Sequence, residues 1–248
     1  MSNILLITAT VTPPSNAIDL RRSDASLRLG DYISALTFYI RLLENRVFDS
    51  IVFSENSNSD ISELRKLAQK SAASNKIEFI SFYGLDYPVE YGRGYGELKL
   101  IEYTMRKSAI IIDAKSSSII WKVTGRYIIE NIEKLISPKT DAVMVCHCRN
   151  YPTRWVEMYF MGWIKSAYNE LFIDISDDIK ENNKGVPAEK SFRLLVDRRS
   201  RKMRIQRRFC ESPKVKGIRG WDNVAYERQT FKRIARALVS RVIPWIWL

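Results

Sequence analysis

The chain has 248 residues, 46% of them apolar and 11% aromatic, which is enough to bury a sizeable core and excludes global disorder. Its 40 Lys and Arg outnumber its 28 Asp and Glu, and the formal charge of +12 predicts anionic partners such as phosphates, acidic lipid headgroups or nucleic acid. No window approaches the roughly 18 uncharged apolar residues needed to span a bilayer, and the first residues lack a secretory leader pattern. Three cysteines make no even disulfide framework, so a reducing cytoplasm is the expected location.

Strand-like and helix-like segments alternate through the first half of the chain. Apolar runs end in small polar residues, as buried strands do, and apolar residues recur at helical spacing between these runs. Gly30-Asp31 is a start signal for the first helix, and Asp60 is expected to cap the second. We expect strands at residues 3–8, 49–53 and 76–81 and helices at residues 31–43, 60–73 and 97–107. This order predicts an α/β fold with a mostly parallel central sheet flanked by helices.

The second half of the chain continues with similar segments and has no internal repeat or long low-complexity tract. We expect strands at residues 118–123, 141–146 and 191–196, helices at residues 128–136 and 155–168, and a polar loop at residues 176–190. The length favours one elaborated domain, which we place at residues 1–225.

Residues 226–248 differ in character from the rest of the chain. Phe231, Ile234 and Leu238 fall on one helical stripe opposed by Lys and Arg, and the segment ends in a run that contains Trp245 and Trp247. One interpretation is a basic amphipathic helix that lies in an anionic membrane interface. The alternative is a docking helix whose tryptophans close the core, and the sequence does not separate the two.

Cys146-His-Cys148 has the residue types of a zinc site but the wrong arrangement for one. On a strand the two cysteines point to one face and His147 to the other, and a further ligand would have to be the remote Cys210 or a carboxylate. Small buried side chains on a core strand are therefore the favoured interpretation.

Polar residues follow the first two predicted strands where each one ends. Thr8 and Thr10 end the first strand, and Glu55, Asn56 and Ser57 end the second. Ligands of open parallel sheets bind beyond the carboxyl ends of the strands, so these side chains are candidates to hold a base or a ribose. Ordinary turn residues are the alternative, because Asn and Ser are common in turns.

A glycine-rich segment precedes the helix expected at residues 97–107. It contains Arg93, Gly94 and Gly96 and ends at Glu97. Closely spaced glycines let a backbone approach a ligand, and the free N–H groups of a helix start favour an anion such as a diphosphate. The spacing matches neither the dinucleotide fingerprint nor a Walker sequence, and a tight turn with positive φ is the alternative.

The segment Trp121–Tyr127, Trp-Lys-Val-Thr-Gly-Arg-Tyr, is the sharpest feature of the sequence. Lys122, Thr124 and Arg126 share one parity, so on a strand they are expected to face the same side, and Gly125 allows a bend between the last two. Two cations and a hydroxyl on one face predict an anion clamp, because arginine binds phosphate oxygens in pairs. The aromatic rings at both ends of the segment argue against the alternative, a solvated strand edge.

Several of these features together resemble bacterial glycosyltransferases of lipopolysaccharide O-antigen and capsule synthesis. The resemblance spans residues 4–136, and its most specific part is the Lys-x-Thr-Gly-Arg-Tyr127 element. The other matching elements are Ala-Thr10 after the first strand, Arg28-Leu-x-Asp-Tyr32, Glu55-Asn-Ser57 and Gly-Arg-Gly-Tyr-Gly-Glu97.

This resemblance implies a GT-A-like (Rossmann-type) fold, a nucleotide-diphosphate sugar donor that is UDP-linked, and a lipid-linked or polysaccharide acceptor at the inner face of the cytoplasmic membrane. Galactose is a donor sugar of such enzymes, but no residue here identifies it. Residues 1–140 would form the nucleotide-sugar half and residues 141–225 the acceptor half. The donor would be held by Thr8, Thr10, Glu55, Asn56, Ser57, Arg93, Gly94, Gly96, Lys122, Thr124, Gly125, Arg126 and Tyr127.

One departure from the family pattern concerns the metal. Most GT-A enzymes hold a divalent cation through Asp-x-Asp, and this chain contains no such sequence. We therefore expect no cofactor and metal-independent transfer, in which Lys122 and Arg126 neutralise the leaving diphosphate, with Mg²⁺ or Mn²⁺ as the alternative. The catalytic base is left open among Glu97, Glu157, Asp174, Asp222 and His147, and Glu97, Glu157 and Asp222 are the favoured candidates.

Two other classes of function compete with this interpretation. The cationic run Arg198–Arg208 would suit the phosphates of a nucleic acid, although no nucleic-acid-binding motif accompanies it and no nucleic-acid partner is expected. A noncatalytic nucleotide-binding protein would use the same polar strand ends.

Overall fold

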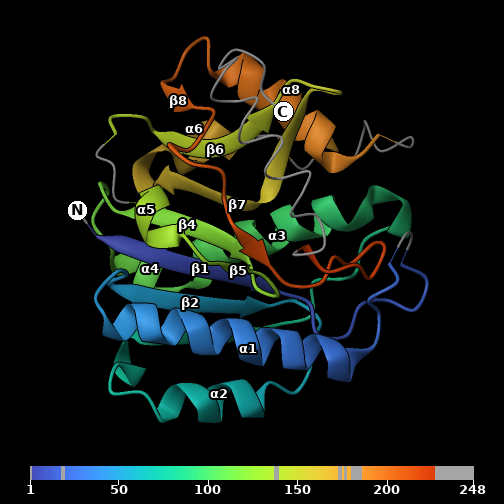
Figure 1. The fold of residues 1–248 in the computed structure, drawn as a ribbon, viewed down its shortest axis with the longest axis vertical. Coiled ribbons are helices and arrows are strands. Elements are labelled where there is room, and N and C mark those ends of the chain that lie inside the picture. The colour runs from blue at the N-terminus through green and yellow to red at the C-terminus, as the bar shows by residue number, and fades with distance from the viewer. Residues whose placement is uncertain are drawn as a thin grey trace.

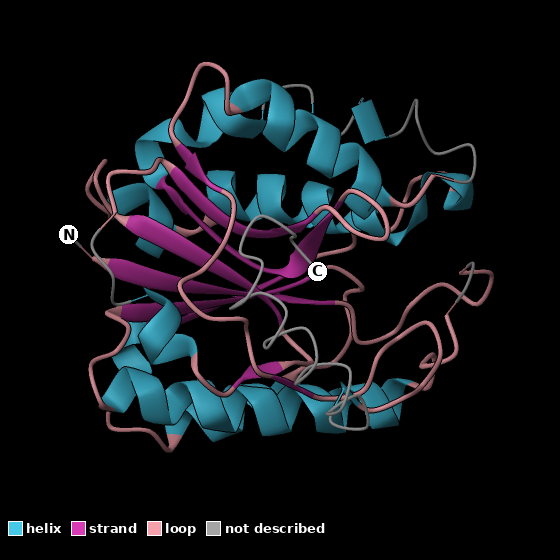
Figure 2. Ribbon diagram, turned by 45° about the horizontal axis from the view of Figure 1, so that its top comes forward, coloured by secondary structure: helices cyan, strands magenta, loops and turns pink. Residues whose placement is uncertain are grey.

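The computed structural model describes residues 2–17, 20–136, 140–172, 175, 178–179 and 186–226. A seven-stranded sheet of order β3-β2-β1-β4-β7-β6-β8 forms its centre (Figures 1 and 2). Neighbouring strands pair in parallel except at β7, which runs antiparallel to both β4 and β6. The expected mostly parallel sheet is therefore confirmed. Its strands are β1 (Asn3–Ala9), β2 (Ser50–Glu55), β3 (Ile77–Ser81), β4 (Ile119–Thr124), β6 (Met144–Arg149), β7 (Trp155–Ile164) and β8 (Ile205–Gln206).

Helices cover both faces of this sheet (Figure 2). One face packs against α1 (Ala25–Glu44), α2 (Ser62–Gln69) and α5 (Ile132–Ile136). The other packs against α3 (Gly92–Lys107), α4 (Ala109–Asp113), α6 (Tyr168–Phe172) and α8 (Ala188–Arg199). On the α1 side, β5 (Ile128–Ile129) pairs with β9 (Val215–Lys216) in a small antiparallel sheet. Short 3-10 helices lie at Ser74–Lys76, Val89–Tyr91 and Lys165–Ala167.

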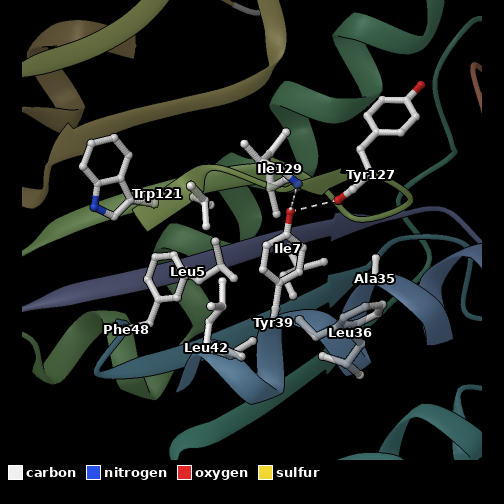
Figure 3. Close-up of a cluster of buried hydrophobic side chains, with 14 of the residues drawn as sticks. Leu5, Ile7, Ala35, Leu36, Tyr39, Leu42, Phe48, Trp121, Tyr127 and Ile129 are labelled. Atoms are coloured by element: carbon white, nitrogen blue, oxygen red, sulfur yellow. Dashed lines mark hydrogen bonds between the residues drawn. The ribbon is translucent and has the colours of Figure 1, made fainter. Parts of the chain in front are cut away.

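The core between α1 and the sheet includes a hydrogen-bonded tyrosine (Figure 3). The Tyr39 hydroxyl donates to the carbonyl of Tyr127 at 2.9 Å and accepts from the N–H of Ile129 at 3.1 Å. Burial raises the pKa of Tyr39, so the hydroxyl stays protonated and can make both bonds. These two hydrogen bonds hold α1 against the segment that follows β4.

The helix predicted at residues 155–168 is wrong, because residues 155–164 form β7 instead. Val156, Met158 and Phe160 are buried, and the residues between them are half-buried, which is the alternation of a strand. Pairing with both β4 and β6 then satisfies the backbone of β7 on both sides.

The strand predicted at residues 191–196 is also wrong, and the helix predicted at residues 128–136 is confirmed only for residues 132–136. Phe192, Leu195 and Val196 face the core from α8, at the spacing of a helix. The second segment is split between β5 and the short α5.

Two helices begin earlier than the sequence predicts. Asp24 caps α1 by accepting a bond from the N–H of Leu27 at 2.8 Å, so Gly30 lies inside the helix. α3 begins at Gly92, which places Gly94 and Gly96 within the helix rather than in a preceding turn. The second predicted helix is observed as α2, and Asp60 accepts a bond from the N–H of Ser62 at 2.8 Å.

The predicted C-terminal helix falls on residues that the structure does not describe, apart from Tyr226. Across the described ranges, no helix has both the length and the apolar character needed to cross a bilayer.

Candidate functional site

The carboxyl ends of β1, β2 and β4 meet at one edge of the sheet, the edge away from the N-terminus in Figure 1. β1 lies between β2 and β4. The chain adds β2 and β3 on one side of β1 and then returns to add β4 on the other side. Such a switch in strand order is where open α/β sheets bind ligands. The register places Thr8 of β1 beside Ser54 of β2 and Thr124 of β4. Residues from several elements meet here, and we call this edge the candidate site.

Glu55 lies behind the loops of this edge rather than on their surface. Its side chain is fully buried and accepts from the N–H groups of Val11 at 3.1 Å, Ser57 at 2.8 Å and Ser59 at 3.2 Å. The carboxylate thus holds two loops in place, and its hydrogen-bonding capacity is largely used inside the protein.

Thr10 and Asn56 are joined across the ends of β1 and β2. The Thr10 hydroxyl donates to Asn56 Oδ1 at 2.6 Å, and Arg28 donates to the Thr10 carbonyl through Nε at 2.8 Å. Asn56 is buried, whereas Thr10 and Ser57 are half-buried. Thr10 and Ser57 are therefore more exposed than Asn56 at these strand ends, and both hydroxyls also form hydrogen bonds within the protein.

The three predicted donor-contacting glycines instead pack against the protein itself. A Cβ at Gly94 would fall 2.1 Å from the Cβ of Ala188, and a Cβ at Gly96 would fall 1.9 Å from the hydroxyl oxygen of Tyr87. A Cβ at Gly125 would fall 2.6 Å from a methyl carbon of Ile7. These glycines allow close packing of α3 and of the turn after β4. Their contact with a ligand stays a prediction.

Lys122 points into the protein, and its predicted contact with the donor stays untested. Its side chain is fully buried, and Nζ lies 2.5 Å from Oε1 of Glu97 and 2.6 Å from the carbonyl of Met158. The hydroxyls of Thr8 and Thr124 donate to the same Glu97 oxygen at 2.9 and 3.0 Å. Burial lowers the pKa of Lys122, and the Glu97 carboxylate opposes that shift.

Trp121 also belongs to the core and does not bracket a site. Its ring stacks on Phe160, with centroids 5.7 Å apart, and its indole N–H donates to Asn3 Oδ1 at 3.0 Å. Tyr127 is buried too, so the two aromatic ends of the predicted clamp contribute mainly packing.

Arg126 lies beyond the end of β4, because the strand ends at Thr124 and residues 125–126 form a turn. Its Nη1 donates to the carbonyl of Ile218 at 2.9 Å, and its guanidinium lies over the ring of Tyr127 at 5.2 Å. The side chain is buried and its Nε atom makes no hydrogen bond in the described structure. The predicted shared face of Lys122 and Arg126 is therefore wrong.

Arg126 converges instead with Arg93, at the backbone of Gly220. A Cβ at Gly220 would lie 3.1 Å from Nη2 of Arg126 and 3.1 Å from Nη1 of Arg93. Neither guanidinium forms an ion pair with a carboxylate in the described ranges. Two unneutralised cations held this close favour an anion between them, since it relieves their repulsion.

The Gly220 backbone belongs to a turn, residues 217–226, that is fastened at several points. Its carbonyl accepts from the N–H groups of Arg21 and Arg22 at 2.9 and 3.0 Å. Asp222 is ion-paired with Arg219 and accepts from the N–H of Val224 at 3.2 Å. Asp222 therefore acts as a brace of the turn, and its carboxylate is committed to that role.

Glu157 and Glu189 are the other carboxylates near this edge. Glu157 on β7 lies 3.4 Å from Nε of Arg149. Glu189, in the first turn of α8, has a pKa raised by burial and by the negative charge of Glu97, against the opposing influence of Arg93 and Arg149. Sequence analysis missed Glu189 because it assigned residue 189 to a loop, although Pro187 followed by Ala-Glu is typical of a helix start.

The donor set at this edge does not fit a divalent metal. Such ions take several oxygen ligands, usually carboxylates, and no group of three or more His, Cys, Asp or Glu gathers among the described residues. The Glu97 carboxylate is already engaged in an ion pair with Lys122. Elsewhere, Cys146 and Cys148 are buried with their sulfur atoms 3.7 Å apart, as expected for a core strand.

Comparison with known proteins gives matches at the level of structure only. No family model and no curated protein matches the sequence. The galactosyltransferase LgtC, in complex with donor and acceptor sugar analogues, aligns with 9% identity over 77% of this chain and 69% of its own, with a TM-score of 0.48. A protein described as a nucleotide-diphospho-sugar transferase from Desulfovibrio desulfuricans G20 aligns with 14% identity over 84% of this chain and 80% of its own, at 0.47.

The glycosyltransferase GlyE of Streptococcus pneumoniae TIGR4 aligns with 8% identity over 83% of this chain and 44% of its own, at a TM-score of 0.46. Similarity at this level assigns no activity and no site residue to the chain.

Proposed function

We propose that this protein is a glycosyltransferase that moves a hexosyl group from a nucleotide-diphosphate sugar, UDP-linked, to a carbohydrate acceptor. The observation that carries the proposal is the convergence of the Arg93 and Arg126 guanidiniums on Gly220, beside the carboxyl ends of β1 and β4. Neither cation forms an ion pair in the described structure, and the edge that holds them is where α/β sheets bind nucleotides.

In this proposal the donor lies along the candidate site, from its nucleoside to its diphosphate. The half-buried side chains of Thr10 and Ser57 would face a ribose or base at the ends of β1 and β2. The diphosphate would then lie against Arg93 and Arg126, whose donors match phosphate oxygens in pairs. These fixed cations would stabilise the negative charge that develops on the leaving diphosphate, without a divalent metal.

The acceptor hydroxyl must lose a proton as it attacks the sugar. In an inverting transfer the acceptor oxygen bonds to the anomeric carbon, the bond from that carbon to the diphosphate oxygen breaks, and the proton passes to a base. Glu97 and Asp222 are committed to Lys122 and Arg219. We infer that Glu189 is the base, because burial and the charge of Glu97 raise its pKa and it forms no ion pair in the described structure. Glu157, paired with Arg149, is the second candidate.

The finer assignments rest on the resemblance and on charge. A lipid-linked glycan acceptor of O-antigen or capsule synthesis, and attachment to the inner face of an anionic membrane, agree with the charge of +12. Galactose is one donor sugar to test. No described residue distinguishes it from other hexoses.

Ion pairs within the basic run weaken the nucleic-acid alternative. Arg198 lies 3.7 Å from Asp178 and Arg207 lies 3.3 Å from Asp197, so part of the run is neutralised inside the protein. Salt-sensitive binding to anionic liposomes but not to duplex DNA would support the transferase, and preferential binding to DNA would oppose it.

Thermal unfolding with a panel of UDP-, GDP- and dTDP-sugars tests the proposal. A ligand present at about 100 times its Kd stabilises the native state by about 2.7 kcal/mol. We expect one nucleotide class, UDP, to raise the melting temperature, and the Arg93→Ala and Arg126→Ala variants to lose that shift. Arg106→Ala is the matched control, because Arg106 is exposed and pairs within α3. If no nucleotide sugar protects the wild-type protein, the proposal fails. Protection without donor hydrolysis or transfer would favour a noncatalytic nucleotide-binding protein.

A further inference from the structure

We propose that Trp221 is the stacking platform for the acceptor sugar ring. This inference rests on the proposed function and adds the acceptor subsite to it. Trp221 follows Gly220 directly and is 55% exposed, in a chain whose Trp121 and Trp163 are 2% and 1% exposed. An exposed indole of this kind loses apolar burial that a ligand ring could restore.

The indole is held in place although it is exposed. The guanidinium of Arg219 lies over the Trp221 ring at 5.1 Å, and Asp222 fixes that guanidinium through an ion pair. The turn itself is closed by the N–H of Arg219 donating to Val224 at 3.0 Å and by the N–H of Tyr226 donating to Gly217 at 3.0 Å. Because the ring is held before any ligand arrives, stacking on it costs little conformational entropy.

The turn is also tied to α1 through Arg22. Arg22 donates to Asp31 at 2.8 Å, and its backbone N–H donates to the carbonyl of Gly220 at 3.0 Å. The residue before Trp221 therefore has a defined position relative to Arg93 and Arg126.

The contacts of the Trp221 side chain favour an acceptor sugar over a nucleobase as its ligand. From Trp221 a series of contacts runs through Arg219 to Tyr226, at 5.8 Å, and from Tyr226 to Tyr159 on β7, at 6.2 Å. β7 lies beyond β4, on the side away from β2. The nucleoside is placed at the ends of β1 and β2, so a ring on Trp221 would lie past the diphosphate, where the acceptor must approach.

The chemistry of the platform suits a pyranose. One face of a pyranose carries C–H groups that pack on an aromatic ring, and the Arg219 guanidinium on one face of the indole leaves the other face for that ring. Asp222 is a positioning residue in this scheme, because it acts only through Arg219 and the turn.

Two binding measurements on the full chain test the platform. Saturation-transfer NMR with methyl β-galactoside and methyl β-glucoside, in the presence of saturating UDP, reports the acceptor site, and calorimetry with UDP alone reports the donor site. We expect Trp221→Ala to reduce the glycoside signal about tenfold and to leave UDP affinity within about twofold, since the stacked ring is lost and the phosphate contacts remain. Trp221→Phe should keep most of the glycoside signal.

Ile112→Ala is the control, because Ile112 is 53% exposed on α4, which leads into the amino end of β4. The inference is overturned if Trp221→Ala leaves the glycoside signal intact, or if wild-type protein gives no such signal. It is also overturned if the substitution weakens UDP about tenfold, which would assign the ring to the nucleobase. Failure of wild-type protein to bind UDP would instead count against the proposed function, so the two failures are distinguishable.

Discussion

Nζ of Lys122 on β4 lies 2.5 Å from Oε1 of Glu97 on α3, and the lysine side chain has no exposed surface. The hydroxyls of Thr8 and Thr124 complete the environment of that carboxylate oxygen. A charge pair of this kind joins the sheet to the helix that carries Arg93. Its role is therefore to position the site, and its loss should first appear as a loss of stability.

Lys122→Met should destabilise the protein by roughly 3–5 kcal/mol, because it leaves the Glu97 carboxylate without its partner next to the core. The double variant Lys122→Met, Glu97→Gln should recover much of that loss, since no charge is then left unpaired. Urea unfolding of the wild type, both single variants and the double variant gives the coupling energy. Additive effects in that cycle would show that the pair contributes nothing as a pair.

The polar strand ends that form the candidate site could be predicted from the sequence. Which cationic side chains come together there could not. The polar ends of β1 and β2 follow from short apolar runs that stop at Thr8 and Ser54. Arg93 and Arg126 converge on Gly220, and that contact joins segments far apart in the chain. Parity along one strand predicted a clamp of Lys122 with Arg126. That prediction failed because spacing along a strand carries no information on which helix or turn packs against it.

The misassigned segments have a related cause. Residues 155–164 are apolar at nearly every position, so helical and strand periods fit them equally well. Pairing with β4 and β6, which are distant in sequence, selects the strand. At residues 191–196 a short apolar segment resembles a strand. The contacts of Phe192 and Leu195 with the sheet face that α3 also covers are what identify it as a helix.

Gly94→Ala should destabilise the protein by about 1–3 kcal/mol, because the new methyl would fall 2.1 Å from the Cβ of Ala188 and force α3 and α8 apart. Gly30→Ala is the matched control within α1, where no atom lies within 4 Å of the new methyl. That substitution should stabilise the protein by about 0.5–1 kcal/mol, since alanine is the better helix former. Chemical denaturation of both variants measures the contrast. If Gly94→Ala is as stable as the wild type and only UDP binding falls, the glycine contacts the ligand after all.

Glu189→Gln should change how stability depends on pH. Burial and Glu97 raise the pKa of Glu189, so between the ordinary carboxyl pKa and the raised one the native state binds the proton more tightly than the unfolded chain does. The free energy of unfolding contributed by this group therefore falls as pH rises through that window. The glutamine variant lacks this pH-dependent decrease. The difference in free energy of unfolding between the variant and the wild type should therefore increase as pH rises through the window and stay constant above it. Urea unfolding across an acidic to neutral pH series checks this, and a difference that is flat with pH would contradict it.

The same substitution should affect catalysis if Glu189 is the base. Turnover should drop by about 10²–10⁴, with little change in UDP affinity, because a general base acts only when the acceptor hydroxyl is deprotonated. Glu157→Gln is the comparison, since Glu157 is the other candidate at this edge and is paired with Arg149. A larger drop with Glu157→Gln than with Glu189→Gln would transfer the role to Glu157.

Transfer should persist after treatment with EDTA, because Arg93 and Arg126 carry the charge that a divalent ion would supply to the leaving diphosphate. Arg126→Ala should reduce turnover by about two orders of magnitude or more, and added Mn²⁺ should not restore it, since no group of three potential ligands gathers in the described part of the chain. Arg126→Lys should restore little, because an ammonium cannot bond phosphate oxygens in pairs as a guanidinium does. Activity that EDTA abolishes and Mn²⁺ restores would show that a metal, and not the arginine pair, neutralises the diphosphate.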